Sequence, residues 1–210
     1  MELTTALKRD LSRWIRERSI FQLDAERVRT PLQVIPVGFS REMIYGHLVN
    51  AFEVNGFVAV SIEHLDEIWR RPTDRMHHEE MRLMGRLDSL PTPPPLDPVP
   101  ETMVDYLRTI PAEELAAIAF AIGSENADCF EKLGWIRSIE QRATETDDAD
   151  DCDQPVVLMQ CFTGSGRVDV DLAEIDIEDI TSVETRSRYL EGYAHYFART
   201  PNPLPYDPDE

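Results

Sequence analysis

The segment Ile62-Glu63-His64-Leu65-Asp66-Glu67-Ile68-Trp69-Arg70-Arg71 has a counterpart 115 residues further on, Ile177-Glu178-Asp179-Ile180-Thr181-Ser182-Val183-Glu184-Thr185-Arg186. The two segments share the spacing of their apolar residues, which stand three apart. A pattern that recurs at a fixed offset indicates a duplicated structural unit. A three-residue step within extended chain is typical of a single 3₁₀ turn, because such side chains then lie on one side before the next strand begins. We therefore predict two related units in which these apolar residues are buried: Ile62, Leu65, Ile68, Ile177, Ile180 and Val183.

Both copies follow a strand pattern and precede a helix pattern. Residues 58–62 and 168–172 carry apolar side chains at every second position, which is the period of a β-strand. Asn55-Gly56 lies between two extended runs and predicts a tight turn, because both residues tolerate positive φ. Apolar residues then suggest a helix after each copy: Met81, Leu83 and Met84 in the first, and Tyr189, Tyr193, Tyr196 and Phe197 in the second.

The proline content of residues 91–100 suggests how the chain is divided. Six of these ten residues are prolines, which have no amide proton, so the segment cannot form a helix or a central strand. We predict that it links a first module, residues 1–90, to a second, residues 101–200, and that 201–210 is a tail. The first module begins with an amphipathic helix over about residues 3–18, because its apolar residues recur at steps of three and four.

The extended segments Val34 to Arg71 and Gly134 to Arg186 resemble the strongly bent strand meander of Sm-like and SH3-like small barrels. The stretch 177–184, with Arg188-Tyr189 after it, is also similar to a family of uncharacterised bacterial proteins. This resemblance implies an α+β fold of two small, strongly bent, antiparallel β-barrel-like (Sm/SH3-like) modules, each accompanied by helices. It covers about half of the chain, and its motifs concern core packing, so it bears on fold more than on function.

The net charge of −19 decides which classes of partner are expected. Such a chain repels phosphate backbones and anionic membrane surfaces, so nucleic acid is an unlikely partner. The first 29 residues are basic on balance, with seven basic side chains against five acidic ones, so the rest of the chain carries a net charge of −21. No apolar stretch is long enough to span a membrane and no signal peptide is evident, so we expect a cytoplasmic protein. The three cysteines have no CxxC spacing, which argues against a disulfide framework or a zinc site.

The sequence contains no catalytic or metal-binding motif that outweighs a structural reading. His77-His78-Glu79-Glu80 supplies two ligands on one helix face, but no HExxH pattern follows, so a solvated helix surface is expected. Thr163-Gly164-Ser165-Gly166 lies between strand patterns and reads as a hairpin turn rather than a phosphate loop. The aspartates between 147 and 153 lack the glycine and glutamate of a calcium loop. We expect no enzyme, no cofactor and no metal.

The sharpest functional hypothesis concerns the strand 168–172, in which valine or leucine alternates with aspartate. Alternation places the carboxylates together on one face, which we expect to be the outer one. With the acids that follow, this face would form an anionic patch: Asp169, Asp171, Glu174, Asp176, Glu178 and Asp179. A basic protein partner suits such a patch, so we predict a non-catalytic protein-interaction or regulatory role. The alternatives are an Sm-like nucleic-acid-binding protein that uses the basic N-terminal helix, and an acidic mimic of nucleic acid.

Overall fold

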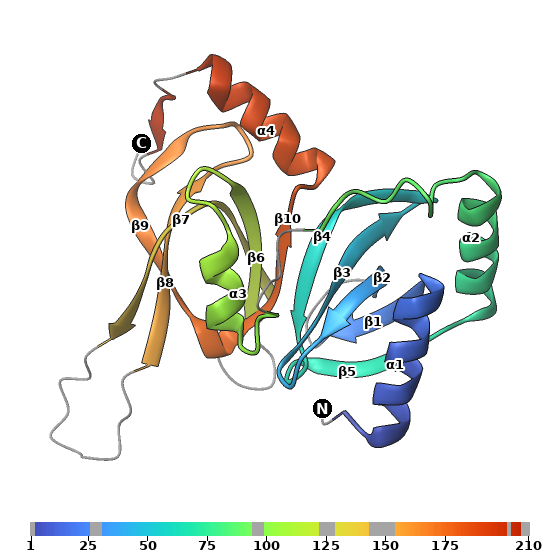
Figure 1. Cartoon of the computed structure of the whole chain (residues 1–210). Helices are drawn as coiled ribbons and strands as arrows, with labels where there is room; N and C mark the ends of the chain where they lie inside the picture. The colour runs from blue at the N-terminus through green and yellow to red at the C-terminus, as the bar shows by residue number, and fades with distance from the viewer. Residues whose placement is uncertain are drawn as a thin grey trace, which may run out of the picture.

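A computed structural model describes residues 3–25, 31–93, 99–121, 129–142, 154–200 and 203–206. The first half of the chain contains α1 (Thr5–Glu17), β1 (Phe21–Ala25), β2 (Leu32–Phe39), β3 (Met43–Asn50), β4 (Glu53–Ser61), β5 (Leu65–Trp69) and α2 (Pro72–Leu83). The second half contains α3 (Met103–Thr109), β6 (Leu115–Ala121), β7 (Cys129–Arg142), β8 (Gln154–Phe162), β9 (Val168–Asp176), the 3₁₀ turn η1 (Ile177–Asp179), β10 (Ile180–Thr185), α4 (Arg188–Arg199) and β11 (Pro205–Tyr206). Figure 1 shows these elements in order of colour.

All described strands belong to one open sheet, and this corrects the predicted fold of two small closed barrel-like modules. The strand order is β11-β9-β8-β7-β6-β10-β4-β3-β2-β1-β5, and only the β11–β9 pair is parallel. The two halves meet where β4 pairs with β10, from Phe57 opposite Thr185 to Val60 opposite Ser182. Each of these strands would otherwise leave a row of unpaired backbone groups at an edge. Pairing between the halves satisfies these groups and makes the sheet continuous, so the strands do not close into two separate barrels.

The strand order nevertheless repeats. The first half has the order β5-β1-β2-β3-β4, and the second has β10-β6-β7-β8-β9, so corresponding strands occupy corresponding places. Glu53–Ser61 and Val168–Asp176, the bounds of β4 and β9, are offset by the same 115 residues as the sequence repeat. The duplication inferred from the apolar spacing is therefore visible in the topology, within a single sheet.

The predicted one-turn step precedes the last strand of each half. The amide of Leu65 donates a hydrogen bond to the Ile62 carbonyl, and the amide of Ile180 donates to the Ile177 carbonyl. Of the six residues predicted to be buried, five are at most 8% exposed: Ile62, Leu65, Ile177, Ile180 and Val183. Ile68 is only half-buried. It lies on β5, which forms one end of the sheet, so its side chain has fewer neighbours than that of Val183 on the central strand β10.

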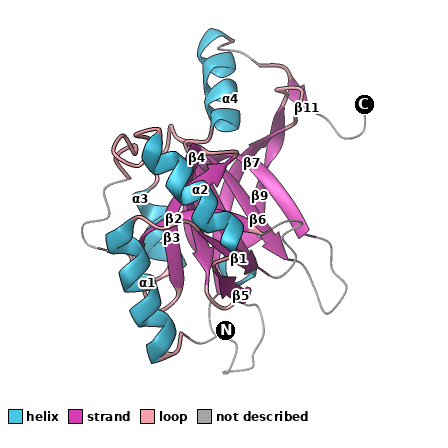
Figure 2. Ribbon diagram, turned by 90° about the vertical axis from the view of Figure 1, so that its right-hand side faces the viewer, coloured by secondary structure: helices cyan, strands magenta, loops and turns pink. Residues whose placement is uncertain are grey.

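The largest core cluster crosses the junction of the two halves. It combines Tyr45 and Phe57 of the first half with Ile118 and Val183 of the second, and α3 adds further apolar side chains. The predicted N-terminal helix is confirmed as α1, which is capped by the Thr4 side chain. Trp14 of α1 stacks on Phe21 in a second cluster, which belongs to the first half. Figure 2 shows α2 in front of the strands, α1 and α3 toward the left of the view, and α4 with β11 at the upper end. The helices α1 and α3 pack against opposite faces of β3 and β4, because α1 contacts the cluster that contains Ile44 and α3 the cluster that contains Tyr45.

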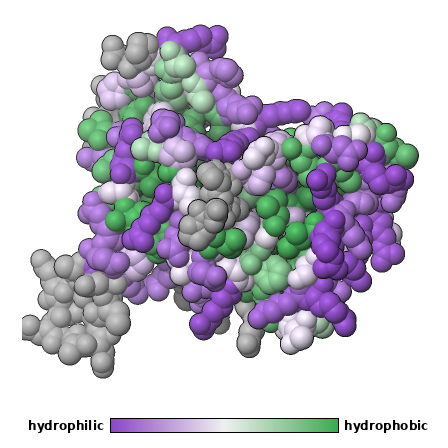
Figure 3. All heavy atoms as spheres, in the orientation of Figure 1, coloured by the Kyte–Doolittle hydropathy of each residue, from purple (hydrophilic) through white to green (hydrophobic). Residues whose placement is uncertain are grey.

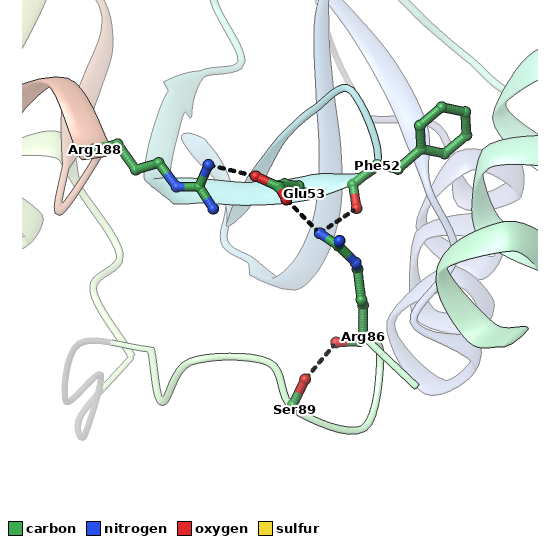
Figure 4. Close-up of polar contacts among 5 residues, drawn as sticks. All are labelled: Phe52, Glu53, Arg86, Ser89 and Arg188. Atoms are coloured by element: carbon green, nitrogen blue, oxygen red, sulfur yellow. Dashed lines mark hydrogen bonds and ion pairs between the residues drawn. The ribbon is translucent and has the colours of Figure 1, made fainter. Parts of the chain in front are cut away.

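Polar contacts also join the halves. The Glu53 carboxylate accepts a hydrogen bond from Arg86, 2.8 Å away, and forms an ion pair with Arg188 at the start of α4 (Figure 4). Both arginines lower the pKa of Glu53, Arg86 most strongly. Residues 94–98 of the predicted linker lie outside the described residues, and the division at 91–100 stays a prediction.

One predicted turn is wrong. Asn55-Gly56 lies inside β4, and the chain reverses instead at Ala51 and Phe52, both of which have positive φ. Gly56 also has positive φ, at +102°, but for another reason. A Cβ atom there would lie 2.7 Å from the Thr185 carbonyl oxygen and 2.8 Å from the Ser187 nitrogen, so glycine allows the end of β10 to cross β4 closely.

Candidate functional site

Strand β9 lies near one end of the sheet and is largely unpaired on its outer side. Its inner neighbour is β8, and on its outer side β11 pairs only with Val168 and Asp169. From Val170 to Asp176, the outer edge faces no other strand of the described chain. Within the described ranges, the backbone N–H and C=O groups on that side pair with no strand, and such groups can receive an added strand.

Three of the six acids predicted to form a patch, Asp171, Glu174 and Asp176, lie in this stretch of β9. Asp169, Asp171, Glu174 and Asp176 belong to β9, and Glu178 and Asp179 follow in η1. The exposed members are Asp171, Glu174 and Glu178, whereas Asp169, Asp176 and Asp179 are half-buried. The structure thus brings all six residues into one continuous segment. Their role in binding stays a prediction.

Arg142, at the end of β7, neutralises part of this patch. Its guanidinium lies 2.9 Å from the Glu174 carboxylate and 3.0 Å from that of Asp176. The hydrogen bond that Arg142 donates to Glu174, together with the charge of Asp176, raises the pKa of Arg142. Arg142 therefore offsets the charges of Glu174 and Asp176, at the end of β9 that leads into η1.

The apolar residues of β9 point the opposite way from the prediction. Val170 is 69% exposed and Leu172 is 42% exposed, whereas Ala173 and Ile175 pack into the core. A register irregularity between Gln160 and Phe162 of β8 lies opposite this part of β9. Such an irregularity changes which residues of the strand face the core. In Figure 3, apolar residues interrupt a mostly hydrophilic surface on both halves of the molecule.

Two of the hollows in the described chain lie at the junction of the halves and beside α4, away from β9 itself. The larger, about 600 Å³, opens at the junction of the halves and is lined by residues that include Ser61, Met103 and Glu178. At its rim, a ring nitrogen of His64 lies 2.7 Å from the Glu178 carbonyl oxygen. The smaller, about 430 Å³, lies between α4 and the β8–β9 turn and is lined by tyrosines, among them Tyr193. Neither brings together a nucleophile, a base and an orienting group in the described chain.

The smaller hollow involves the turn 163–166, which confirms the predicted hairpin. The Gly166 amide donates to the Thr163 carbonyl, and Gly166 has a φ of +78°. The Tyr193 hydroxyl donates to the Gly164 carbonyl oxygen at 2.8 Å. The polar groups of the turn are thus hydrogen-bonded within the chain, and the turn serves to connect β8 with β9.

Cys161 and His77 are further side chains with chemically reactive groups, and both contact other residues of the fold. Burial raises the pKa of the Cys161 thiol to about 11, so the thiolate that a nucleophilic cysteine needs is scarce at neutral pH. His77 contacts the Gln33 amide and the ring of Phe52. Within the described ranges, no three His, Cys, Asp or Glu side chains are grouped to hold a metal ion.

His47 was not singled out from the sequence. It is buried in β3 against the Phe57 ring, and burial, together with the charge of Arg18, lowers its pKa. A lone histidine in an apolar strand gives no sequence signal of such a position.

The basic N-terminal helix is partly engaged within the chain. Arg13 forms an ion pair with Asp10 at 3.1 Å, and Arg18 donates a hydrogen bond to the Leu87 carbonyl oxygen. No helix in the described part of the chain is long and apolar enough to cross a membrane.

Comparisons with known proteins identify no relative of this chain. No family model matches the chain, and neither a curated protein nor a solved structure is significantly similar to it.

Proposed function

We propose that this chain is a non-catalytic, cytoplasmic protein-interaction module that binds a protein partner by adding a strand to the outer edge of β9. The observation that supports this proposal is the combination of a free strand edge with exposed apolar and acidic side chains. The free edge runs from Val170 to Asp176, and Val170 and Leu172 are exposed along it.

Each part of this edge suits one component of strand addition. Backbone hydrogen bonds supply affinity, and alternate side chains of the receiving strand supply specificity. Val170 and Leu172 offer apolar area that the partner would remove from water. Asp169 and Asp171 favour basic residues in the incoming strand and would speed its approach.

The test uses two fluorescent peptides of equal length, one alternating valine with lysine and the other alternating valine with glutamate. We expect fluorescence anisotropy to report binding of the lysine peptide, with an association rate that falls as salt increases. The double substitution Asp169→Asn/Asp171→Asn should slow this association and reduce its salt dependence. The double substitution Val170→Ser/Leu172→Ser should speed dissociation.

A matched control removes two exposed carboxylates elsewhere, through Glu113→Gln/Glu191→Gln. This variant should bind the lysine peptide at a rate close to that of the wild type. Equal binding of both peptides, or no effect of the aspartate substitutions at low salt, would refute the proposal. Salt-dependent binding of an RNA oligonucleotide that requires Lys8 and Arg9 would instead favour the nucleic-acid alternative.

A further inference from the structure

We infer that the strand added to β9 is β5 of a second copy of this chain, so that copies join head to tail. This inference rests on the proposed function, because it names the partner of the same edge. It is drawn from the pairing of β4 with β10 within one chain, which we call the internal joint. The inferred pairing of β9 with β5 of another copy is the external joint.

The internal joint pairs the fourth strand of the first half, β4, with the last strand of the second half, β10. The repeat places β9 at the position of β4 and β5 at the position of β10. The two ends of the described sheet therefore present the complementary sides of this joint. Among the described residues, no strand pairs with the outer side of β9 from Val170 onward, and β5 pairs only with β1.

The repeat also fixes a register for the external joint. In the internal joint, Ser182, Val183, Glu184 and Thr185 lie opposite Val60, Ala59, Val58 and Phe57. The 115-residue offset converts these pairs into Glu67 opposite Ile175, Ile68 opposite Glu174, Trp69 opposite Ala173, and Arg70 opposite Leu172. Residues that lie directly opposite one another in antiparallel strands have Cα atoms about 4.5 to 5.5 Å apart.

Burial differs between the two joints as this inference requires. Phe57 is 2% exposed in the internal joint, whereas its counterpart Leu172 is 42% exposed. Val183 is fully buried, whereas its counterpart Ile68 is only half-buried. Each outer edge thus has one apolar side chain that is more exposed than its counterpart in the internal joint: Leu172 on β9 and Ile68 on β5. Docking of β5 on β9 would remove them from water.

Charge favours the same orientation. The pair after Arg70 and Leu172 would place Arg71 opposite Asp171, and both of these residues are exposed. Opposite charges on facing strands stabilise the pair. At the other end, Asp66 would face Asp176, whose charge Arg142 already offsets at 3.0 Å.

One difference between the joints lies at Gly56. Its counterpart is Asp171, so the chain after β5 cannot approach β9 as closely as Ser187 approaches Gly56. Backbone pairing in the external joint would end at Arg70 and Leu172, the counterparts of Thr185 and Phe57, where the internal pairing also ends. The joint is heterologous, because each copy contributes one β5 edge and one β9 edge, and its repetition gives a ring or a filament.

Cross-linking of two single-cysteine variants tests this register, in a background in which Cys129, Cys152 and Cys161 are replaced by serine. Ile68→Cys and Glu174→Cys are purified separately, mixed and oxidised, and the products are resolved on a non-reducing gel. We expect a covalent dimer from the mixture at several times the yield from either variant alone, because facing Cα atoms lie within disulfide range. The out-of-phase pair Glu67→Cys with Glu174→Cys should give only the background yield, because these side chains point to opposite faces.

Sedimentation velocity supplies the second measurement. The wild-type chain should sediment as species heavier than the 24.1 kDa monomer, and Leu172→Asp should shift it to the monomer with unchanged secondary structure by circular dichroism. A wild-type chain that stays monomeric at all concentrations, or equal cross-linking of both cysteine pairs, would overturn the inference. If the lysine peptide still bound β9 in that case, the proposed function would stand without self-association.

Discussion

At the scale of single residues, Gly56 is required by the close approach of Thr185 and Ser187 to its Cα. Asn55-Gly56 predicts positive φ, and Gly56 does have it, but the residue lies within β4 rather than in a turn. The requirement arises from Ser187, which is far away in the sequence. The actual turn residues, Ala51 and Phe52, carry no turn signal. Local propensity therefore could not predict where the chain reverses.

Gly56→Ala should destabilise the protein, because alanine tolerates the left-handed region poorly and its Cβ would meet the Thr185 carbonyl. The expected loss is about 2 kcal/mol or more, the combined effect of strain and a backbone clash. The matched control is Gly192→Ala in α4, where an added Cβ has no neighbour within 4 Å. In this control, the free energy of unfolding should rise by about 0.5 to 1 kcal/mol. Urea unfolding of both variants measures the difference, and an equal effect in the two would contradict this account of Gly56.

Glu184 on β10 should make the stability of the protein depend on pH. Burial raises its pKa above the ordinary glutamate value of 4.5, and a hydrogen bond to Ser187 offsets part of this. The folded protein therefore keeps the proton to a higher pH than the unfolded chain, and stability falls as pH rises above 4.5. Glu184→Gln should raise the midpoint of thermal unfolding at pH 7, with a smaller gain near pH 4. A gain of equal size at both pH values would show that ionisation is not its cause.

At the scale of secondary-structure elements, apolar spacing predicted the last strand of each half well and the face of β9 poorly. The trio Ile177, Ile180 and Val183 is buried because a one-turn step feeds a central strand. Alternation in β9 correctly indicated a strand. The outward direction of Val170 and Leu172 was missed, because it depends on how β8 pairs with β9 and not on the β9 sequence.

Truncating equivalent residues in β10 and β5 should show that burial contributes more to stability in a central strand than in an edge strand. Ile180→Ala should cost about 2 to 4 kcal/mol, because a fully buried large aliphatic side chain leaves a cavity. Ile68→Ala should cost clearly less, since part of that side chain is already exposed in a single copy. Unfolding in urea at low protein concentration measures both values. Similar losses would mean that Ile68 is as well covered as Ile180.

At the scale of the whole molecule, the sequence predicted the duplication but not the continuous sheet. Strand edges join through backbone groups that every residue possesses, so no residue pattern marks the pairing of β4 with β10. The six acids of the candidate site were found from their spacing alone. Their position at a free edge depends on the strand order, which only the three-dimensional structure provides.

Cleavage within the proline run tests how strongly the two halves hold together. A protease site that replaces residues 94–98 can be cut without breaking any described strand or helix. We expect the two fragments to co-elute in native size-exclusion chromatography, because β4 pairs with β10, one core cluster spans the junction, and Glu53 bridges Arg86 and Arg188. The uncut variant serves as the control for elution volume, and urea should separate the fragments. If the fragments instead elute separately in native buffer, residues 1–90 and 101–200 are independent modules, and the joint between β4 and β10 is too weak to be the template for assembly between chains.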